Sequence, residues 1–234
     1  MKYLVLDTST EWCSVALWLD GRIHARRVLA EQRHSSLLLP MLDDLLRESD
    51  ISLRQLDGLA YGAGPGSFTG LRIACAVTQG LALGADLPVV GVSTLESIAE
   101  QTAAERVLAV LDARMAEVYW AAYRREGDGW QAVVEPQLAL PESVAVPEGD
   151  EWAGVDWVGA GNGFVVLGEV LRPRLAARLT RIDDTLVPDA AAMAPLAARA
   201  FARGEGMDAA LAAPIYLRDK VALTVDERRA KNSI

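Results

Sequence analysis

The chain has 234 residues, of which 51% are hydrophobic, and its formal net charge is −9. This length suits one large domain or two domains of roughly 100 residues each, with enough apolar residues for a proper core. An acidic chain repels a phosphate backbone, which argues against nucleic-acid binding without the help of other proteins.

The first predicted elements are three strands. "MKYLVLDTST" contains an apolar run that is too short for a signal peptide and predicts a strand ending at Asp7. A second apolar run, residues 15–18, leads into Asp20-Gly21, and Asp-Gly between strand-like runs is a strong hairpin signal. "RIHARRVLA" predicts the third strand. We expect no apolar run of the roughly 18 residues that cross a bilayer, and therefore a cytoplasmic protein.

Helices and strands alternate after these three strands. Residues 32–48 carry apolar side chains at helical spacing and predict an amphipathic helix. The next predicted elements are a helical turn at 52–56, a strand at 56–62, the glycine-rich stretch "YGAGPGSFTG", a helix at about 70–85, a strand at 88–93, and a helix that starts at the Ser93–Glu96 capping box and runs to about 103.

The second half begins like the first. Aligning Asp112 with Asp7 places "AVLD" over "LVLD" and residues 120–123 over 15–18, and each copy then reaches a glycine-containing turn and a third strand, the second of which is "WQAVVE". One strand ending in aspartate looks much like another, but the shared register favours a duplication. The order β-β-β-α-β-α-β-α matches the ribonuclease-H-like half of the actin, sugar kinase and Hsp70 superfamily, an α/β fold of two lobes with mixed sheets.

The predicted domains are an N-terminal actin-like lobe at 1–104, a C-terminal actin-like lobe at 105–222 and a flexible charged tail at 223–234. The second lobe is less regular than the first. "DWVGAGNGF" predicts a strand, a glycine turn and a helix start, "AAMAPLAARAFARGEG" predicts a helix ending at glycine, and "PIYLRDKVA" predicts a short closing segment.

The glycine-rich stretch is either a phosphate cradle or a tight strand-to-helix corner. Gly64, Gly66 and Gly70 allow positive φ, and Ser67 can cap the following helix, whose N-terminus attracts anions. The spacing is neither GxxxxGK[ST] nor GxGxxG, and no lysine follows. The residues alone favour the corner and leave the anion site open.

Two further positions are candidates for contacts with a nucleotide or another anion. In the actin-like superfamily, ATP lies between the lobes against the turns that follow the repeated aspartates. Here these turns begin with Asp7-Thr8-Ser9 and with Asp112, and neither turn contains a glycine. The hydroxyl groups could bind phosphate and the carboxylates could hold Mg²⁺ through water, but the favoured interpretation is that both aspartates only end a strand.

The two long helices of the first half predict a packing surface. Ala76, Gly80 and Gly84 recur every four residues and leave a groove where another helix can approach closely. The helix at 32–48 carries more apolar surface than one stripe needs; its candidate interface residues are His34, Leu38, Met41, Leu42 and Leu45. The surface is either internal to the chain or shared with another chain.

Metal and protease motifs are absent from the sequence. The two histidines, His24 and His34, lie in neither HxxxH nor HExxH, and nothing positions either for a Ser-His-Asp triad. Cys13 and Cys75 are far apart in the sequence and are expected to be buried free thiols.

Several stretches together resemble one bacterial family. They are "LDTST", "CSVALW", "RHSSLLLPMLDDLL", "GAGPGSFTGLRIACAVTQGLALGADLPVVGVSTLES", "LDARMAEVYWA" and "PIYLRDKVA". They are similar to the TsaB family, formerly YeaZ, of tRNA threonylcarbamoyladenosine biosynthesis proteins. The resemblance is nearly continuous over residues 1–124, returns at 214–222 and is weak between them.

This resemblance implies a scaffold in a complex that modifies tRNA. TsaB proteins are two-lobed and form a heterodimer with their paralogue TsaD, which performs the threonylcarbamoyl transfer. TsaE, an ATPase, joins them, and TsaC makes the donor. The resemblance also implies that the chain can form a homodimer, that tRNA is bound only through the complex, and that no cofactor is held firmly, with ATP and Mg²⁺ used at the level of the complex.

The resemblance also locates a loss of metal ligands. TsaD binds a metal through an HxxxH motif in a stretch resembling "GVNHLEGH", which corresponds to "GVSTLESI" here. Thr94 and Ile98 stand at the two histidine positions, so the resemblance implies a non-catalytic chain. Two alternatives stay open: an autonomous ATP-dependent enzyme with the actin-like fold and, with less support, a peptidase that acts on its paralogue.

Overall fold

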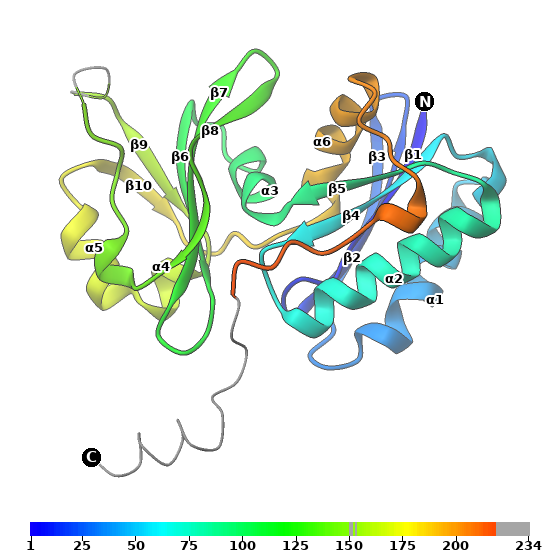
Figure 1. Cartoon of the computed structure of the whole chain (residues 1–234), viewed down its shortest axis with the longest axis horizontal. Helices are drawn as coiled ribbons and strands as arrows, with labels where there is room; N and C mark the ends of the chain where they lie inside the picture. The colour runs from blue at the N-terminus through cyan, green and yellow to red at the C-terminus, as the bar shows by residue number, and fades with distance from the viewer. Residues whose placement is uncertain (150–151, 153, 219–234) are drawn as a thin grey trace, which may run out of the picture.

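The computed structural model describes residues 1–149, 152 and 154–218. They form two lobes side by side, each built on one five-stranded mixed sheet (Figure 1). Residues 219–222 of the predicted closing segment, and the predicted tail at 223–234, lie outside the described residues.

The first sheet has the strand order β3-β2-β1-β4-β5. Its strands are β1 (Lys2–Asp7), β2 (Trp12–Leu19), β3 (Arg22–Leu29), β4 (Gly58–Gly64) and β5 (Val89–Ser93). Asp20 and Gly21 join β2 to β3 with φ values of 49° and 93°, the left-handed conformation of a two-residue hairpin turn. β1, β2 and β3 pair antiparallel, whereas β4 pairs parallel to both β1 and β5.

The second sheet repeats this topology. Its strands are β6 (Arg106–Asp112), β7 (Val118–Glu126), β8 (Gly129–Ala139), β9 (Trp157–Ala160) and β10 (Leu179–Asp183), in the order β10-β9-β6-β7-β8. The three-strand meander and the parallel neighbours correspond one to one with those of the first sheet. The predicted duplicated two-lobe α/β fold is therefore confirmed. The third strand is longer than predicted, because β8 continues through Pro136 to Ala139.

Three helices cover the first sheet. α1 (His34–Glu48) and α2 (Phe68–Ala85) pack on one face, where leucines from α1 meet Leu4, Leu6 and Leu59. α6 (Ala190–Ala202) packs on the other face, where Met193 and its neighbouring alanines contact Val5 and Val92. Phe201 of α6 stacks on Tyr3 with ring centroids 4.3 Å apart. The alanine content of α6 lets the helix lie close to the sheet.

The two lobes exchange their last helices. α3 (Thr94–Glu100) follows β5 of the first sheet, yet Leu95 and Ile98 pack against β6 and β7 of the second. α6 follows β10 of the second sheet and packs on the first. A division of the chain at residue 104 therefore separates the two sheets but not their helices.

The remaining helices are short. α4 (Gly163–Val166) and α5 (Gly168–Leu175) belong to the second lobe, and the 3₁₀ turns are η1 (Leu53–Gln55), η2 (Pro141–Ser143) and η4 (Ala209–Leu211). The predicted capping box of Ser52 and Gln55 is present at η1. At the start of α3 the Ser93 hydroxyl accepts from the Glu96 N–H, which is the serine half of the second predicted box.

Helix α2 requires a correction of the expectation on membrane spans. By length and composition alone its 18 residues, with a mean hydropathy of 1.2, could cross a membrane; in the described part of the chain it is the one helix that passes this test. Leu71, Ala74 and Ala82 of α2 are nevertheless buried inside the first lobe. α2 is thus a core helix of this lobe with one face left outside.

Candidate functional site

The glycine-rich stretch packs directly on the turn between β1 and β2. The Ser67 N–H donates to the Ser9 carbonyl at 2.7 Å, and the Thr8 hydroxyl donates to the Gly70 carbonyl at 2.7 Å. Ser67 in turn caps α2 by accepting from the Gly70 N–H at 3.3 Å. The end of β1 and the start of α2 therefore form one hydrogen-bonded unit.

This packing explains the glycines of the stretch. A Cβ atom on Gly66 would lie 2.6 Å from the Ser9 carbonyl oxygen, and one on Gly70 would lie 1.8 Å from the Thr8 carbonyl oxygen. Gly64 has a φ of 124°, which favours glycine, and a Cβ atom there would lie 2.7 Å from the Ile215 carbonyl oxygen. The stretch is a tight corner filled by the chain itself, in agreement with the interpretation that the residues alone favoured.

Asp7 is buried completely beneath this corner. Its Oδ2 accepts from the Ser9 hydroxyl at 3.0 Å and from the Ser9 N–H at 3.3 Å, while Oδ1 has no hydrogen-bond partner. Oδ1 lies against Gly62, where a Cβ atom would come within 2.1 Å of it. Burial raises the pKa of Asp7 to about 7, against the hydrogen bonds from Ser9 that lower it. A carboxyl group in this position is poorly suited to hold Mg²⁺.

Asp112 ends β6 in the corresponding place of the second lobe. Its Oδ1 accepts from the Arg114 N–H at 2.8 Å, and its Oδ2 is 3.1 Å from the Arg114 guanidinium. The Asp112 N–H donates to the Asn162 side-chain carbonyl at 3.0 Å. Both carboxylate oxygens are thus already engaged by the chain, as expected for an aspartate that ends a strand.

A cleft of about 840 Å³ lies between the lobes. Of the predicted anion-contact residues, Ser9, Gly66, Ser67 and Asp112 line it. The wall also contains residues that were not predicted, among them Asn162, Tyr216 and Arg218. Asp7, Thr8 and Gly64, which were predicted with the first group, are buried behind the wall. Glu11 and Glu31 line it as well. The cleft therefore offers hydroxyl, amide, guanidinium and carboxylate groups.

The closing segment, residues 213–218, runs along this cleft from one lobe to the other. Tyr61 anchors its start, because the phenol both accepts from the Ala213 N–H and donates to the Ala213 carbonyl at 3.0 Å. Tyr216 accepts from Arg72 Nε at 2.8 Å. Arg218 reaches the second lobe, where it pairs with Glu117 at 2.6 Å and donates to the Ala113 carbonyl at 3.0 Å. No local sequence pattern indicated these contacts, because they join residues about 100 or more positions apart.

Thr94 and Ile98 stand where the resemblance places the TsaD histidines. Thr94 and Ile98 are both fully buried, and the Thr94 hydroxyl donates to the Pro65 carbonyl. His34 is also buried, and its Nε2 has no hydrogen-bond partner. Within residues 1–149, 152 and 154–218, no group of three potential metal-binding side chains comes together. Cys13 and Cys75 are buried free thiols, as predicted.

The two predicted interface helices differ in exposure. In α1 the candidate residues His34, Leu38, Met41, Leu42 and Leu45 are all buried within this chain. They belong to the core of the first lobe, because their side chains face the sheet, and they offer no surface to a partner. In α2, by contrast, Ala76, Gly80 and Gly84 are exposed, and nothing lies within 4 Å of a Cβ atom built on either glycine. Of these eight candidate interface residues, only the three of the α2 stripe are exposed.

Comparisons with known proteins identify the family. The family model for TsaD, tRNA N6-adenosine threonylcarbamoyltransferase, matches residues 27–224. The Escherichia coli tRNA threonylcarbamoyladenosine biosynthesis protein TsaB is 42% identical over 95% of this chain and 96% of its own length. The chain belongs to the TsaB (YeaZ) family. A second member, from Haemophilus influenzae, is 36% identical over 94% of this chain and 95% of its own length.

Solved structures agree with this assignment to the TsaB family. YeaZ from Pseudomonas aeruginosa superposes with a TM-score of 0.82 at 41% identity, over 92% of this chain and 99% of that one. A second Pseudomonas aeruginosa structure, described as an uncharacterized protein with similarity to peptidase YeaZ, gives a TM-score of 0.83 at 41% identity over 93% of this chain and 99% of that one. The predicted family and its two-lobed fold are confirmed.

Proposed function

We propose that this chain acts in the biosynthesis of threonylcarbamoyladenosine in tRNA as a non-catalytic subunit that binds TsaD. The observation that carries the proposal is the 42% identity with Escherichia coli TsaB over nearly the whole of both chains. The match to the TsaD family model is consistent with a paralogue of the transferase.

The chemistry of the site supports a non-catalytic role. The two positions of the TsaD metal motif hold Thr94 and Ile98, and neither side chain faces solvent. A buried isoleucine cannot ligate a metal, so an electrophilic metal centre of the TsaD kind cannot form here. The two repeated aspartates are also constrained, since Asp7 is buried and Asp112 is paired with Arg114.

The docking surface we propose is the exposed stripe of α2. Ala76, Gly80 and Gly84 leave a shallow path along the helix, and Leu83 beside them is 63% exposed. A helix of TsaD could approach this path closely, and burial of Leu83 would add apolar contact. The nearby leucines of α1 would support the surface from inside the lobe.

The test is association of the Gly80→Leu variant with TsaD, measured by size-exclusion chromatography and calorimetry. A leucine at residue 80 points into open space, so the variant should fold normally while its side chain blocks the path. Ala202→Leu is the matched control, because residue 202 is exposed on α6, away from the stripe. We expect at least about a hundredfold weaker binding for Gly80→Leu, the effect of a buried clash at an interface centre, and unchanged binding for the control.

Two results would contradict this proposal. Normal affinity of folded Gly80→Leu for TsaD would remove the docking surface from α2. Threonylcarbamoyl transfer by the purified chain alone would exclude the non-catalytic role.

The remaining parts of the proposal concern the complex. TsaE would join the TsaD-bound chain, TsaC would supply the donor, and tRNA would be held through the complex, in the cytoplasm. ATP and Mg²⁺ would be used by other subunits, since Asp7 is buried and Asp112 is paired with Arg114. In the absence of TsaD the same stripe would allow the chain to form a homodimer.

A second candidate function is an autonomous ATP-dependent enzyme. The cleft favours this function because it lies between the lobes, where ATP lies in the actin-like superfamily. However, Asp7 is buried and Asp112 is paired with Arg114, so neither fits a Mg²⁺–ATP site. The discriminating measurement is ATP turnover by the chain alone and by Asp112→Ala. Robust turnover that depends on Asp112 would support the enzyme, and none is expected.

A peptidase function has no comparable support. His34 Nε2 has no hydrogen-bond partner, and His24 lies on the exposed edge strand β3. Neither histidine is therefore placed to activate a nucleophile.

A further inference from the structure

The carboxylate of Glu100 connects the two lobes. Glu100 ends α3, and its Oε2 accepts from Trp130 Nε1 of β8 at 2.7 Å. Its Oε1 accepts from Arg199 Nη2 of α6 at 2.9 Å, and Arg125 of β7 approaches Oε2 at 3.9 Å. Trp130 and Arg125 belong to the second sheet, whereas α6 packs on the first. One side chain thus holds donors that move with different lobes.

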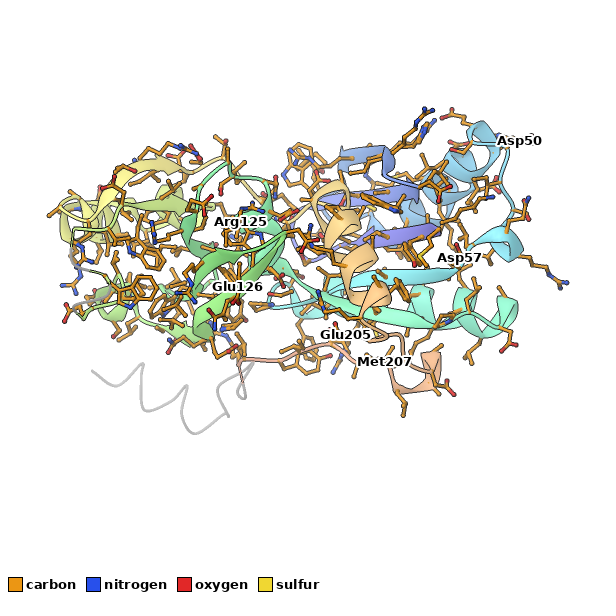
Figure 2. The ribbon with its side chains drawn as sticks, turned by 90° about the horizontal axis from the view of Figure 1, so that it is seen from above. Asp50, Asp57, Arg125, Glu126, Glu205 and Met207 are labelled. Carbon is orange, nitrogen blue, oxygen red and sulfur yellow. The ribbon has the colours of Figure 1, made fainter. Side chains whose placement is uncertain are left out.

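The surroundings of Glu100 make these contacts stronger than an ordinary surface ion pair. The side chains of Glu100, Arg199 and Arg125 are only 13%, 18% and 26% exposed. The Arg125 guanidinium also lies over the Trp130 ring at 4.2 Å. Charged hydrogen bonds gain strength where water is largely excluded, and loss of one partner leaves a partly buried charge unpaired. Figure 2 shows Arg125 on the second-lobe side of the junction and Glu205, which follows α6, on the first-lobe side.

The closing segment forms a second connection between the lobes. In the first lobe, the Ile215 N–H donates to the Ala63 carbonyl at 2.7 Å. Three residues later, Arg218 binds Glu117 and the Ala113 carbonyl of the second lobe. The Arg218 side chain is only 14% exposed. This short stretch leaves little slack between its two anchors, since extended backbone spans at most about 3.5 Å per residue.

We propose that the Glu100 contacts and the closing segment hold the two lobes at one fixed angle, so that this chain is a rigid two-lobed body. The two connections use separate segments of the chain and separate elements of each lobe. Because α3 packs on the second sheet, rotation of one lobe against the other would stretch the closing segment, separate Glu100 from Arg199 of α6, or do both. The inference does not depend on the proposed role in tRNA modification.

The test is an interlobe distance distribution from spin labels and electron paramagnetic resonance. Ser35→Cys on α1 and Glu169→Cys on α5 place one label on each lobe at exposed positions, whereas the native Cys13 and Cys75 are buried. The labelled chain should give a single narrow distribution. Glu100→Ala combined with Arg218→Ala should add a second population at another distance. Arg199→Met combined with Arg218→Ala is a milder variant that removes the donor on α6 and keeps most of the side-chain length, and it should broaden the distribution.

The matched control is Arg203→Ala in the same labelled chain. Arg203 pairs with Glu205 just beyond the end of α6, but both residues lie on the first-lobe side and both are more than half exposed. This control should leave the distribution unchanged. A broad distribution in the unaltered chain, or a distribution that neither double variant changes although both are folded by circular dichroism, would overturn the proposal.

Discussion

The two lobes share a sheet topology but differ in the helix that comes after the fourth strand. In the first lobe, the glycine-rich corner leads into the 18-residue helix α2. In the second lobe, Gly161 and Gly163 lead into α4, which has only four residues. Both corners let glycine approach a carbonyl oxygen, that of Thr8 or Ser9 in one lobe and that of Val110 in the other. The comparison teaches that close approach between the first and fourth strands is common to both lobes, whereas a long helix follows the fourth strand only in the first.

The lobes also differ between the third and fourth strands. The first lobe has α1 there, with five leucine or methionine side chains buried against the sheet. In the second lobe, the described residues between β8 and β9 form no α-helix and bury Val144, Val146 and Trp152 instead. Trp152 contacts Trp157 of β9 with ring centroids 5.5 Å apart. A few large side chains thus cover the sheet face that a regular helix covers in the other lobe.

The largest expected effect comes from closing the corner of the first lobe. Gly70→Ala places a Cβ atom 1.8 Å from the Thr8 carbonyl oxygen, so backbone must move. We expect a loss of about 5 kcal/mol or more in the free energy of unfolding, measured by urea denaturation. Gly161→Ala in the second lobe, where the distance to the Val110 carbonyl oxygen is 2.2 Å and φ is 111°, should cost a similar amount. A cost below about 1 kcal/mol for either variant would show that its corner is not tightly packed.

The next prediction concerns the pH dependence of the free energy of unfolding, to which Asp7 should contribute and Asp112 should not. Burial raises the pKa of Asp7 from 3.8 to about 7. Between about pH 4 and pH 7, the folded chain therefore keeps a proton on Asp7 that the unfolded chain has released. The contribution of Asp7 to stability is therefore greatest below pH 4 and falls by roughly 4 kcal/mol as pH rises to 7 and above. Asp7→Asn should remove this fall, and unfolding measured at several pH values would test it.

Two comparisons make the pH experiment decisive. Asp112→Asn should keep the pH slope that Asp7→Asn loses. Burial also raises the pKa of Glu96 to about 7, so a smaller slope of the same sign should persist in Asp7→Asn. Identical pH profiles for the unaltered chain and Asp7→Asn would contradict the assignment of a raised pKa to Asp7.

A smaller effect concerns the aromatic cover of the second lobe. Trp152→Ala removes a side chain that is 8% exposed and contacts Trp157. We expect a loss of about 3 kcal/mol, within the range for large aromatic side chains in cores, measured by thermal unfolding. Leu42→Ala in α1 serves for comparison and should cost about 2–4 kcal/mol. If Trp152→Ala had no measurable effect, the irregular segment would not cover the second sheet as described.

The smallest expected effect is a gain. Gly80→Ala adds a methyl group to an exposed helix position with nothing within 4 Å. Because alanine restricts the unfolded chain and favours the helix, we expect about 0.5–1 kcal/mol of added stability. Differential scanning calorimetry would measure it as a raised Tm. Destabilisation would mean that the stripe of α2 is packed against this chain itself.

Local patterns were sufficient for much of the fold. Aspartate and glycine at residues 20–21 indicated the hairpin, and the repeated strand ending in aspartate indicated the duplication that the two sheets confirm. The capping serines indicated the helix starts, because a hydroxyl that accepts from the third N–H of a helix is a local interaction. The length of β8 was underestimated because Pro136, which normally interrupts a strand, is tolerated on this edge strand.

The candidate site was only partly predictable. Ser9, Gly66, Ser67 and Asp112 could be named because glycine and hydroxyl residues at strand ends mark such sites. Asp7 could not be separated from them, since its burial comes from chain segments distant in sequence, among them Gly62 of β4, and these contacts have no local signal. The leucines of α1 were assigned to an interface because a sequence gives the number of apolar residues on a helix but not the area that its own sheet covers.

The sequence by itself determined the repeated strand order, the main helices and the family resemblance, because these arise from periodicity, turn residues and motifs within short windows. Only the tertiary structure decided that α3 and α6 are exchanged between the lobes and that Glu100 and Arg218 join them. Such contacts link residues about 100 positions apart. Their formation depends on how two complete sheets pack, and no local pattern of residues encodes that.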